Sequence, residues 1–329
     1  MGLAIETLGL TKDYSVGFWR KQPKRVLHGL DLRVERGEVF GLLGPNGAGK
    51  TTTLKILMRL TFPTAGTARL LGKPFDDFRA HAQVGYLPEN PYFYDHLTAE
   101  EFLKYAAALF GLPRAEGQRR TWDLLERVGL KEVWNVPLRK FSKGMVQRLG
   151  VAQALINDPQ LVILDEPMSG LDPLGRREAR DLILDLRERG KTVLFSTHIL
   201  PDAETLCDRV AILNQGRLLG CGELVEILRM GVAATELLLE APSAALLHEL
   251  SVHTRSIVRT GERVRIVLRE ETDIATVLDL AAHHNGKIVS LNPVKASLED
   301  YFMARVADSS PARVDERQLQ RSKGDRKER

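Results

Sequence analysis

The chain has 329 residues, of which 43% are hydrophobic and 27% charged, a balance that excludes a disordered chain and favours one or two soluble globular domains. No apolar run approaches the roughly 18 residues of a membrane span. The formal net charge of +4 permits an anionic partner but does not require nucleic acid, and we expect no nucleic-acid partner.

The N-terminus and the cysteines exclude several further classes of protein. The first residues lack the basic and apolar regions of a secretory signal, which predicts a cytoplasmic protein. Glu6 stands where a myristoylated protein needs serine or threonine. Cys207 and Cys221 are too few for a disulfide framework and lack metal-type spacing, so we expect small buried side chains.

The first half of the chain alternates strand and helix patterns. Residues 3–8 and 30–34 alternate apolar and polar residues, as antiparallel strands do. Residues 37–60 are typical of a buried strand, a Gly-rich loop and a helix. Thr98 and Glu101 form a capping box that predicts the start of another helix.

Further helices are expected at 115–129 and 143–157. Two continuous apolar runs follow, "QLVILDEP" and "KTVLFSTH", and such runs predict parallel strands that are buried on both faces. Residues 173–190 between them form an amphipathic helix pattern. Residues 209–222 predict a hairpin with its turn at 214–216.

The pattern changes after residue 223. Residues 233–306 have the order βαββαβ followed by a helix, which predicts a small ferredoxin-like α+β domain. Residues 307–329 are rich in charged side chains and nearly devoid of apolar ones, so we expect a disordered tail.

A phosphate-binding loop is the most specific motif. "GPNGAGKT" is G-x-x-x-x-G-K-T between a strand and a helix, where glycines let backbone N–H groups face phosphate oxygens. The helix N-terminus adds partial positive charge. Lys50 would reach the β- and γ-phosphates, and the Thr51 hydroxyl would bind Mg²⁺. The expected nucleotide-binding residues here are Gly44, Pro45, Asn46, Gly47, Ala48, Gly49, Lys50, Thr51 and Thr52.

Acidic residues end the strand "LVILDEP". Ligands collect at the carboxyl ends of parallel strands, so an acidic pair there suits a phosphate-binding loop better than a merely solvated strand end. We expect Asp165 to hold Mg²⁺ and Glu166 to take a proton from the attacking water. His198 ends the next strand and is expected to contact the γ-phosphate, with a packed or solvated histidine as the alternative.

The stretch "FSKGMVQR" begins a helix. Ser142 and Gly144 at this helix start make a good anion site, yet no anionic partner follows nearby in the sequence.

The motifs "GPNGAGKTT", "FSKGMVQR", "LVILDEP", "SGLD" and "FSTH" occur in this order. In this combination residues 3–228 resemble the nucleotide-binding subunit of an ATP-binding cassette (ABC) transporter. The resemblance implies a P-loop cassette with a mixed-sheet core, an antiparallel β subdomain and a helical subdomain at about 95–158. The C-terminal remainder resembles the extension of exporter-type cassettes whose permease is a separate chain.

The same resemblance implies that two cassettes bind ATP and Mg²⁺ between them, head to tail. Ser142 and Gly144 of one chain would cap the γ-phosphate held by the P-loop of the other. Tyr14 would stack on adenine, with Phe18 and Trp19 as competitors. The loop along the dimer interface would be Ser169, Gly170, Leu171 and Asp172.

Two departures from the family pattern matter. Lys143 and Met145 replace glycine and glutamine of L-S-G-G-Q, and Phe141 replaces its leucine. Lys143 must be helical or extended, because a non-glycine residue disfavours φ > 0, and its ammonium points either toward the triphosphate or into solvent. Glu89 replaces a glutamine, and its charge beside bare phosphate would oppose binding. We therefore expect Glu89 either to approach Mg²⁺ in the closed state or to lie away from the site when no nucleotide is bound.

The implied partners are a second cassette, identical or paired, and a membrane permease, with this subunit peripheral on the cytoplasmic face. Tyr92, Phe93 and Tyr94 either line a permease groove or pack in the core. The basic, aromatic residues 18–25 lie either near lipid headgroups or in a longer hairpin loop. The C-terminal domain has a dimerisation or structural role, or binds a regulatory ligand.

The alternative function is an ABC ATPase of translation or DNA repair. A single cassette, with a short interval between the P-loop and "LDEP", favours a transporter.

Overall fold

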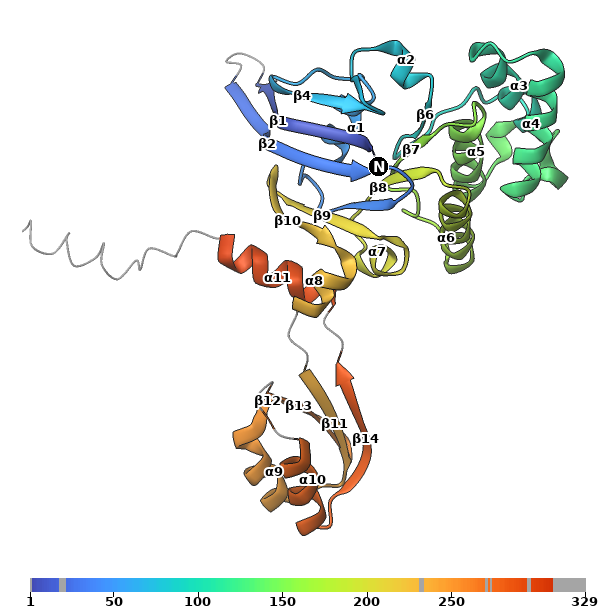
Figure 1. The fold of residues 1–329 in the computed structure, drawn as a ribbon. Helices are drawn as coiled ribbons and strands as arrows, with labels where there is room; N and C mark the ends of the chain where they lie inside the picture. Colours follow the sequence, from blue (N-terminus) through green and yellow to red (C-terminus); the bar gives the residue numbers. More distant parts are fainter. Residues whose placement is uncertain are drawn as a thin grey trace, which may run out of the picture. The chain divides into compact units, whose positions relative to one another are not determined.

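The computed structural model describes residues 2–17, 22–230, 234–269, 272, 274–294 and 297–309. The chain divides into two compact units, one reaching to Leu224 and the other formed by Val225–Ala307 (Figure 1). Phe18, Trp19 and most of the predicted tail lie outside the described residues.

An antiparallel sheet begins the first unit. Its strand order is β2-β1-β4-β5. The strands are β1 (Leu3–Val16), β2 (Gln22–Glu35), β4 (Ala65–Leu70) and β5 (Lys73–Pro74). The strands β1 and β2 are longer than the alternating pattern predicted, because register shifts in their pairing interrupt the alternation without ending the ladder.

A six-stranded mixed sheet with the order β10-β9-β3-β8-β7-β6 forms the centre of the first unit. Its strands β6, β7, β8, β3 and β9 are parallel, which the continuous apolar runs predicted for β7 and β8, and β10 pairs antiparallel with β9. The strands are β3 (Val39–Leu43), β6 (Val84–Leu87), β7 (Leu161–Asp165), β8 (Thr192–Thr197), β9 (Arg209–Asn214) and β10 (Arg217–Glu223).

Helix α1 covers one face of this sheet. Leu54 and Ile56 of α1 share a buried core with Phe40, Ile163 and Leu194 of the strands. Besides three helices described below, the first unit contains α1 (Lys50–Leu57), α2 (Phe78–His81), α6 (Pro173–Glu188) and α7 (Leu200–Leu206). Helix α8 (Leu224–Met230) lies almost entirely in the second unit. The periodicity had not predicted α2, α7 or α8, since each has too few residues to show a clear helical repeat.

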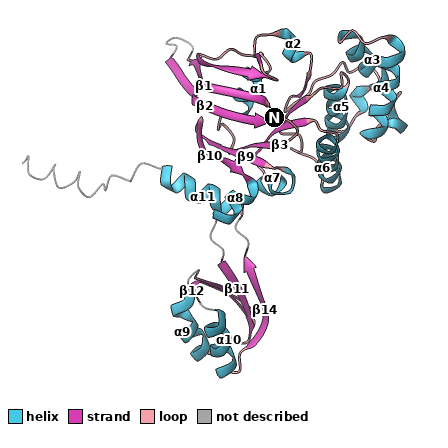
Figure 2. Ribbon diagram, in the orientation of Figure 1, coloured by secondary structure: helices cyan, strands magenta, loops and turns pink. Residues whose placement is uncertain are grey.

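A group of helices follows β6. Helix α3 (Ala99–Leu109) starts at the predicted capping box of Thr98, and α4 (Arg114–Arg127) and α5 (Lys143–Leu155) pack together with it (Figure 2). Two 3₁₀ turns, Lys131–Val133 and Leu138–Lys140, join α4 to α5.

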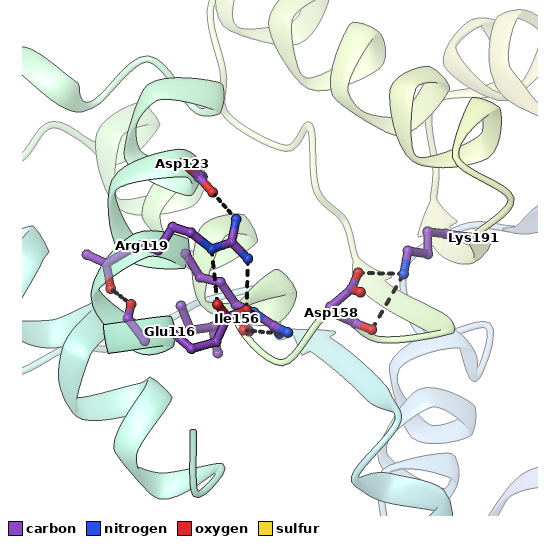
Figure 3. A network of polar contacts seen from close by, with 9 residues as sticks. Glu116, Arg119, Asp123, Ile156, Asp158 and Lys191 are labelled. Carbon is purple, nitrogen blue, oxygen red and sulfur yellow. Dashed lines mark hydrogen bonds and ion pairs between the residues drawn. The ribbon is translucent and has the colours of Figure 1, made fainter. Parts of the chain in front are cut away.

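Polar contacts join this helical group to the central sheet (Figure 3). Arg120 of α4 donates to Glu116 at 2.6 Å and to the carbonyl of Ile156, just past α5, at 3.1 Å. Lys191, directly before β8, pairs with Asp158 at 2.5 Å. The end of α5 is therefore held both by α4 and by the segment that enters the sheet.

The second unit has the predicted order βαββαβ. Its strands form one antiparallel sheet in the order β12-β13-β11-β14, and its core includes Leu237, Leu246, Ile266 and Val277. Helix α11 runs to Ser309, past the expected end of the domain at residue 306. The elements are β11 (Ala234–Glu240), α9 (Ala244–Leu250), a 3₁₀ turn (Ser251–His253), β12 (Thr254–Thr260), β13 (Arg263–Leu268), α10 (Ile274–His283), β14 (Lys287–Val294) and α11 (Leu298–Ser309). Among the described residues no helix combines the length and the apolar character that crossing a bilayer requires.

Candidate functional site

The Gly-rich loop between β3 and α1 depends on glycine at defined positions. Gly44 has φ 150°, and a Cβ there would lie 2.2 Å from the carbonyl oxygen of Leu213. Gly49 precedes α1 with φ 106°, and no side chain caps the helix. The first N–H groups of α1 are therefore left for a ligand.

The turn of the β9–β10 hairpin packs against the Gly-rich loop and is hydrogen-bonded to it. The N–H of Gly216 donates to the carbonyl of Ala48 at 2.9 Å, and the carbonyl of Gly216 accepts from the N–H of His28 at 2.9 Å. A Cβ on Gly216 would lie 2.0 Å from the carbonyl oxygen of Val26. Three segments distant in sequence therefore meet at this glycine.

Lys50 is buried at the start of α1. Its Nζ donates to the carbonyl of Gly44 at 2.7 Å and lies 3.1 Å from Oε1 of Glu166. The sequence predicted both residues for the site but not their ion pair.

Glu166 is held in an unusual backbone conformation. Its φ is 50°, in the left-handed region that costs a non-glycine residue about 1–3 kcal/mol. Its N–H donates to Oγ of Ser196 at 2.9 Å, and its Oε2 lies 2.9 Å from Nδ1 of His198. The buried carboxylate thus lies between Lys50 and His198.

Asp165 is almost completely buried and binds two hydroxyls through one oxygen. Ser196 Oγ donates to Oδ1 at 2.6 Å and Thr51 Oγ1 donates to it at 3.2 Å. Burial raises the pKa of the Asp165 carboxyl, and the negative charges of Glu89 and Glu166 act in the same direction, against the two hydroxyls.

Ser196 belongs to the site although the sequence did not predict it there. The available signal was a serine within an apolar strand, in register with Asp165 on the neighbouring strand. Its use required knowledge that these two strands pair.

A pocket of about 310 Å³ opens above the Gly-rich loop. Glu89, which the sequence analysis placed near Mg²⁺, contributes to its wall, and Val26 of β2 contributes although the sequence did not mark it. The lining residues are Val26, Pro45, Asn46, Gly47, Ala48, Gly49, Lys50, Thr51, Thr52, Glu89 and Glu166.

Tyr14 is not among the residues that line this pocket. It lies on β1 opposite Lys24, with Nζ of Lys12 at 4.9 Å from its ring centroid.

Ser142 and Gly144 lie at a second pocket. Ser142 caps α5, accepting from the N–H of Met145 at 3.3 Å. This pocket has a volume of about 360 Å³, and it shares no lining residue with the first. The structure therefore brings Lys50, Thr51, Asp165, Glu166 and His198 together and leaves Ser142 and Gly144 at a separate place. The lining residues are Ser142, Lys143, Gly144, Arg148, Gly170, Leu171, Asp172, Leu174, Gly175 and Glu178.

Lys143 is the first residue of α5, so it is helical as its side chain requires. The lysine lies over Gly170, since a Cβ on that glycine would be 2.3 Å from its Nζ.

The loop Ser169–Asp172 connects the two pockets along the chain. The N–H of Ser169 donates to the carbonyl of Glu166 at 3.1 Å. Asp172 caps α6 by accepting from the N–H of Gly175 at 2.8 Å. Gly170, Leu171 and Asp172 line the second pocket.

The aromatic segment after Glu89 divides between core and surface. Phe93 is buried with its ring centroid 4.6 Å from that of Phe102. Tyr92 and Tyr94 are 86% and 53% exposed. Only the two tyrosines remain available to a partner.

Comparison with known proteins identifies the family. A family model described as ABC transporter matches residues 27–169. An uncharacterized ABC transporter ATP-binding protein of Synechocystis sp. is 46% identical over 92% of this chain and 85% of its own length. The bacitracin transport ATP-binding protein BcrA of Enterococcus faecalis is 34% identical over 92% of this chain and 96% of its own.

A solved structure extends the comparison to bound products. The cassette MJ0796, a dimer in a post-hydrolysis state bound to ADP and Pi, is 25% identical with a TM-score of 0.61, covering 67% of this chain and 98% of that one. With the phosphate-binding geometry above, these similarities show that the chain belongs to the ATP-binding subunits of ABC transporters, the ATPases of that family.

Proposed function

We propose that two copies of this chain, or this chain and a paired cassette, hydrolyse Mg·ATP head to tail and thereby drive export through a separate membrane permease. The observation that carries the proposal is the separation of the two pockets. Lys50 lines one and Ser142 the other, with no residue in common, so each pocket supplies half of a site. The dimeric state of MJ0796 supports the pairing of two cassettes, and the transport name of BcrA supports a role in transport.

The P-loop of one chain binds the triphosphate. Its N–H groups and the uncapped start of α1 face the phosphates, and Lys50 compensates their charge. Tyr14 stacks on adenine from β1, beyond the residues that line the pocket. Residues 3–228 form this cassette, with a helical part at about 95–158.

The residues at the bottom of the pocket fit Mg²⁺. Thr51, Asp165 and Glu89 offer only oxygen, which this hard cation prefers, and Oδ2 of Asp165 is buried without a hydrogen-bond partner in the described chain. The described residues contain no ready-made cluster of three His, Cys, Asp or Glu side chains, and a cation shared with phosphates does not need one. When bound, Mg²⁺ neutralises charge on the β- and γ-phosphates.

Glu166 acts as the general base. Its carboxylate accepts a proton from the water whose oxygen attacks the γ-phosphorus, while the bond to the β–γ bridging oxygen breaks and ADP leaves. The contact with His198 fixes one carboxylate oxygen, and the bond from its own N–H to Ser196 fixes the backbone. Lys50 and His198 then stabilise charge on the transferred phosphoryl group.

The opposite chain completes the site. Ser142 and the Gly144 N–H at the start of α5 bind the γ-phosphate in trans, and the loop Ser169–Asp172 lies along the interface. Loss of the γ-phosphate removes the anion that joins the two halves, so the dimer opens. Exposed Tyr92 and Tyr94 contact the permease at the cytoplasmic face of the membrane. The domain at 233–306 has a dimerisation or structural role.

A mixing experiment tests the shared site. Lys50→Ala and Ser142→Arg variants should each lose ATPase activity as homodimers. A mixed dimer retains one intact site, built from the unmodified Lys50 of one chain and the unmodified Ser142 of the other, so mixing should restore activity. If heterodimers form and activity stays at the sum of the two variants, the head-to-tail proposal is wrong.

A second variant tests the general base. Glu166→Gln should reduce turnover by about 10²–10⁴ while nucleotide-dependent dimers persist in size-exclusion chromatography with light scattering. Retained turnover would exclude Glu166 from this role.

A third variant tests the metal role of Glu89. Glu89→Gln should change the Mg²⁺ dependence of turnover, and an unchanged Mg²⁺ dependence would contradict a metal role of Glu89.

A further inference from the structure

Tyr86 lies on the strand next to Asp165 and on the same face of the sheet. In the parallel pairing of β6 with β7, Tyr86 stands opposite Ile163. Side chains alternate along a strand, so Asp165, two residues after Ile163, shares its face with both. Ile163 belongs to the core under α1, and Tyr86 packs against that core. The tyrosine therefore lies on the face that carries the phosphate site.

Two oxygens on this face are buried and unpaired. The Tyr86 hydroxyl and Oδ2 of Asp165 are each inaccessible to solvent and have no hydrogen-bond partner among the residues that the structure describes. An unpaired buried polar group costs about 1–3 kcal/mol, so a single such atom calls for an explanation. Because both atoms lie on one face of neighbouring strands, and the charge of Asp165 acts on the Tyr86 hydroxyl, one partner between them can satisfy both.

The chemistry of the two oxygens is complementary. Burial raises the pKa of Tyr86 to about 12, and the negative charges of Asp165 and Glu89 act in the same direction. The hydroxyl is therefore protonated at neutral pH and can donate. Oδ2 of Asp165 can only accept when the carboxylate is ionised. Buried water commonly bridges such groups, making about three hydrogen bonds.

We propose that Tyr86 is a positioning residue for the metal site: its hydroxyl binds a water that also donates to Oδ2 of Asp165, and so orients that carboxylate toward Mg²⁺. This inference rests on the proposed metal role of Asp165. Thr51 and Ser196 hold Oδ1 directly, and Tyr86 supplies the missing restraint on the other oxygen. Groups that hydrogen-bond to a metal-ligating residue set the orientation of that residue and the affinity of the site for the metal.

A purely structural tyrosine predicts a different result. Phenylalanine would fill the same space against the core without an unpaired hydroxyl, so a core role predicts that Tyr86→Phe leaves metal affinity unchanged. A positioning role predicts that metal affinity falls while the metal-free protein remains at least as stable.

The test compares three variants of the full chain, Tyr86→Phe, Asp165→Asn and, as a matched control, Tyr105→Phe on the exposed side of α3. Binding of Mn²⁺ to the ADP-loaded protein is measured by electron paramagnetic resonance, and unfolding by urea is measured in EDTA. Tyr86→Phe should weaken Mn²⁺ binding about tenfold without loss of stability, and Tyr105→Phe should change neither.

The outcomes separate this inference from the proposed function. Normal Mn²⁺ binding by Tyr86→Phe, with weakened binding by Asp165→Asn, would overturn the role of Tyr86 and leave the metal site in place. Equal Mn²⁺ binding by Asp165→Asn and the unmodified protein would remove the metal site itself, and the inference with it. A Tyr86→Phe protein that loses stability in EDTA in proportion to its metal affinity would reveal a structural role and also overturn the inference.

Discussion

Replacement of Ser196 by alanine tests how the two acidic residues are held. The Ser196 hydroxyl is completely buried, donates to Oδ1 of Asp165 at 2.6 Å and accepts from the N–H of Glu166 at 2.9 Å. Alanine removes both bonds and changes little else, because the two side chains are similar in size. The effect therefore reports on these contacts.

The magnitude follows from the two bonds. A hydrogen bond to a charged group contributes about 1.5–3 kcal/mol and a neutral one about 0.5–1.5 kcal/mol. Asp165 retains the bond from Thr51, so we expect Ser196→Ala to lower the free energy of unfolding by about 2–4 kcal/mol. For a unit of this size that corresponds to a fall in melting temperature of about 4–16 °C.

Calorimetry and urea unfolding measure the loss, and steady-state ATPase assays measure its effect on the site. Thr192→Val is the matched control on the same strand, since Thr192 is also buried and its Oγ1 accepts a single bond, from the N–H of Gly37 at 2.9 Å. We expect the control to lose about 1–2 kcal/mol and to keep its ATPase activity, whereas Ser196→Ala loses both stability and activity.

A Ser196→Ala protein with the stability and turnover of the unmodified chain would refute this reasoning. It would show that the carboxylate of Asp165 and the left-handed backbone of Glu166 keep their geometry without the serine.

Other features of the chain give three further predictions. Hydrogen bonds from two arginines lower the pKa of Glu116 to about 2, so the stabilising contribution of its carboxylate is present above the ordinary carboxyl pKa and is lost as pH falls toward 2. The difference in melting temperature between the unmodified chain and Glu116→Gln should therefore shrink between pH 5 and about pH 2. A difference that stays constant over this range would contradict the prediction. Gly85→Ala should cost about 1–3 kcal/mol in urea unfolding, because the new Cβ would lie 1.9 Å from the carbonyl oxygen of Ala154, and unchanged stability would show that α5 can shift away from β6. Cys221 is exposed, where the sequence predicted a buried side chain, and Cys207 is buried as predicted. Ellman's reagent should therefore label Cys221 in the native protein and Cys207 only after denaturation, and rapid labelling of both would contradict the burial of Cys207.

Local patterns predicted the elements whose signals are local. The P-loop glycines, the capping box at Thr98 and the apolar strands follow from the residues themselves, and the structure confirms these elements. The contacts of Ser196 and the position of Tyr86 near Asp165 depend on which strands are neighbours and in which register, and a single sequence does not state that. The ion pair of Lys50 with Glu166 likewise requires the fold to be known.

The glycine of the β9–β10 turn has a consequence for ligand affinity. Gly216 binds Ala48 and His28 and leaves no space for a side chain, so the Gly-rich loop keeps its shape through contacts made when the chain folds. Fixing a flexible backbone costs about 1–2 kcal/mol per residue. Because the loop is already ordered before a phosphate binds, the binding free energy is not reduced by the entropic cost of ordering the loop, and the affinity for the anion is correspondingly higher.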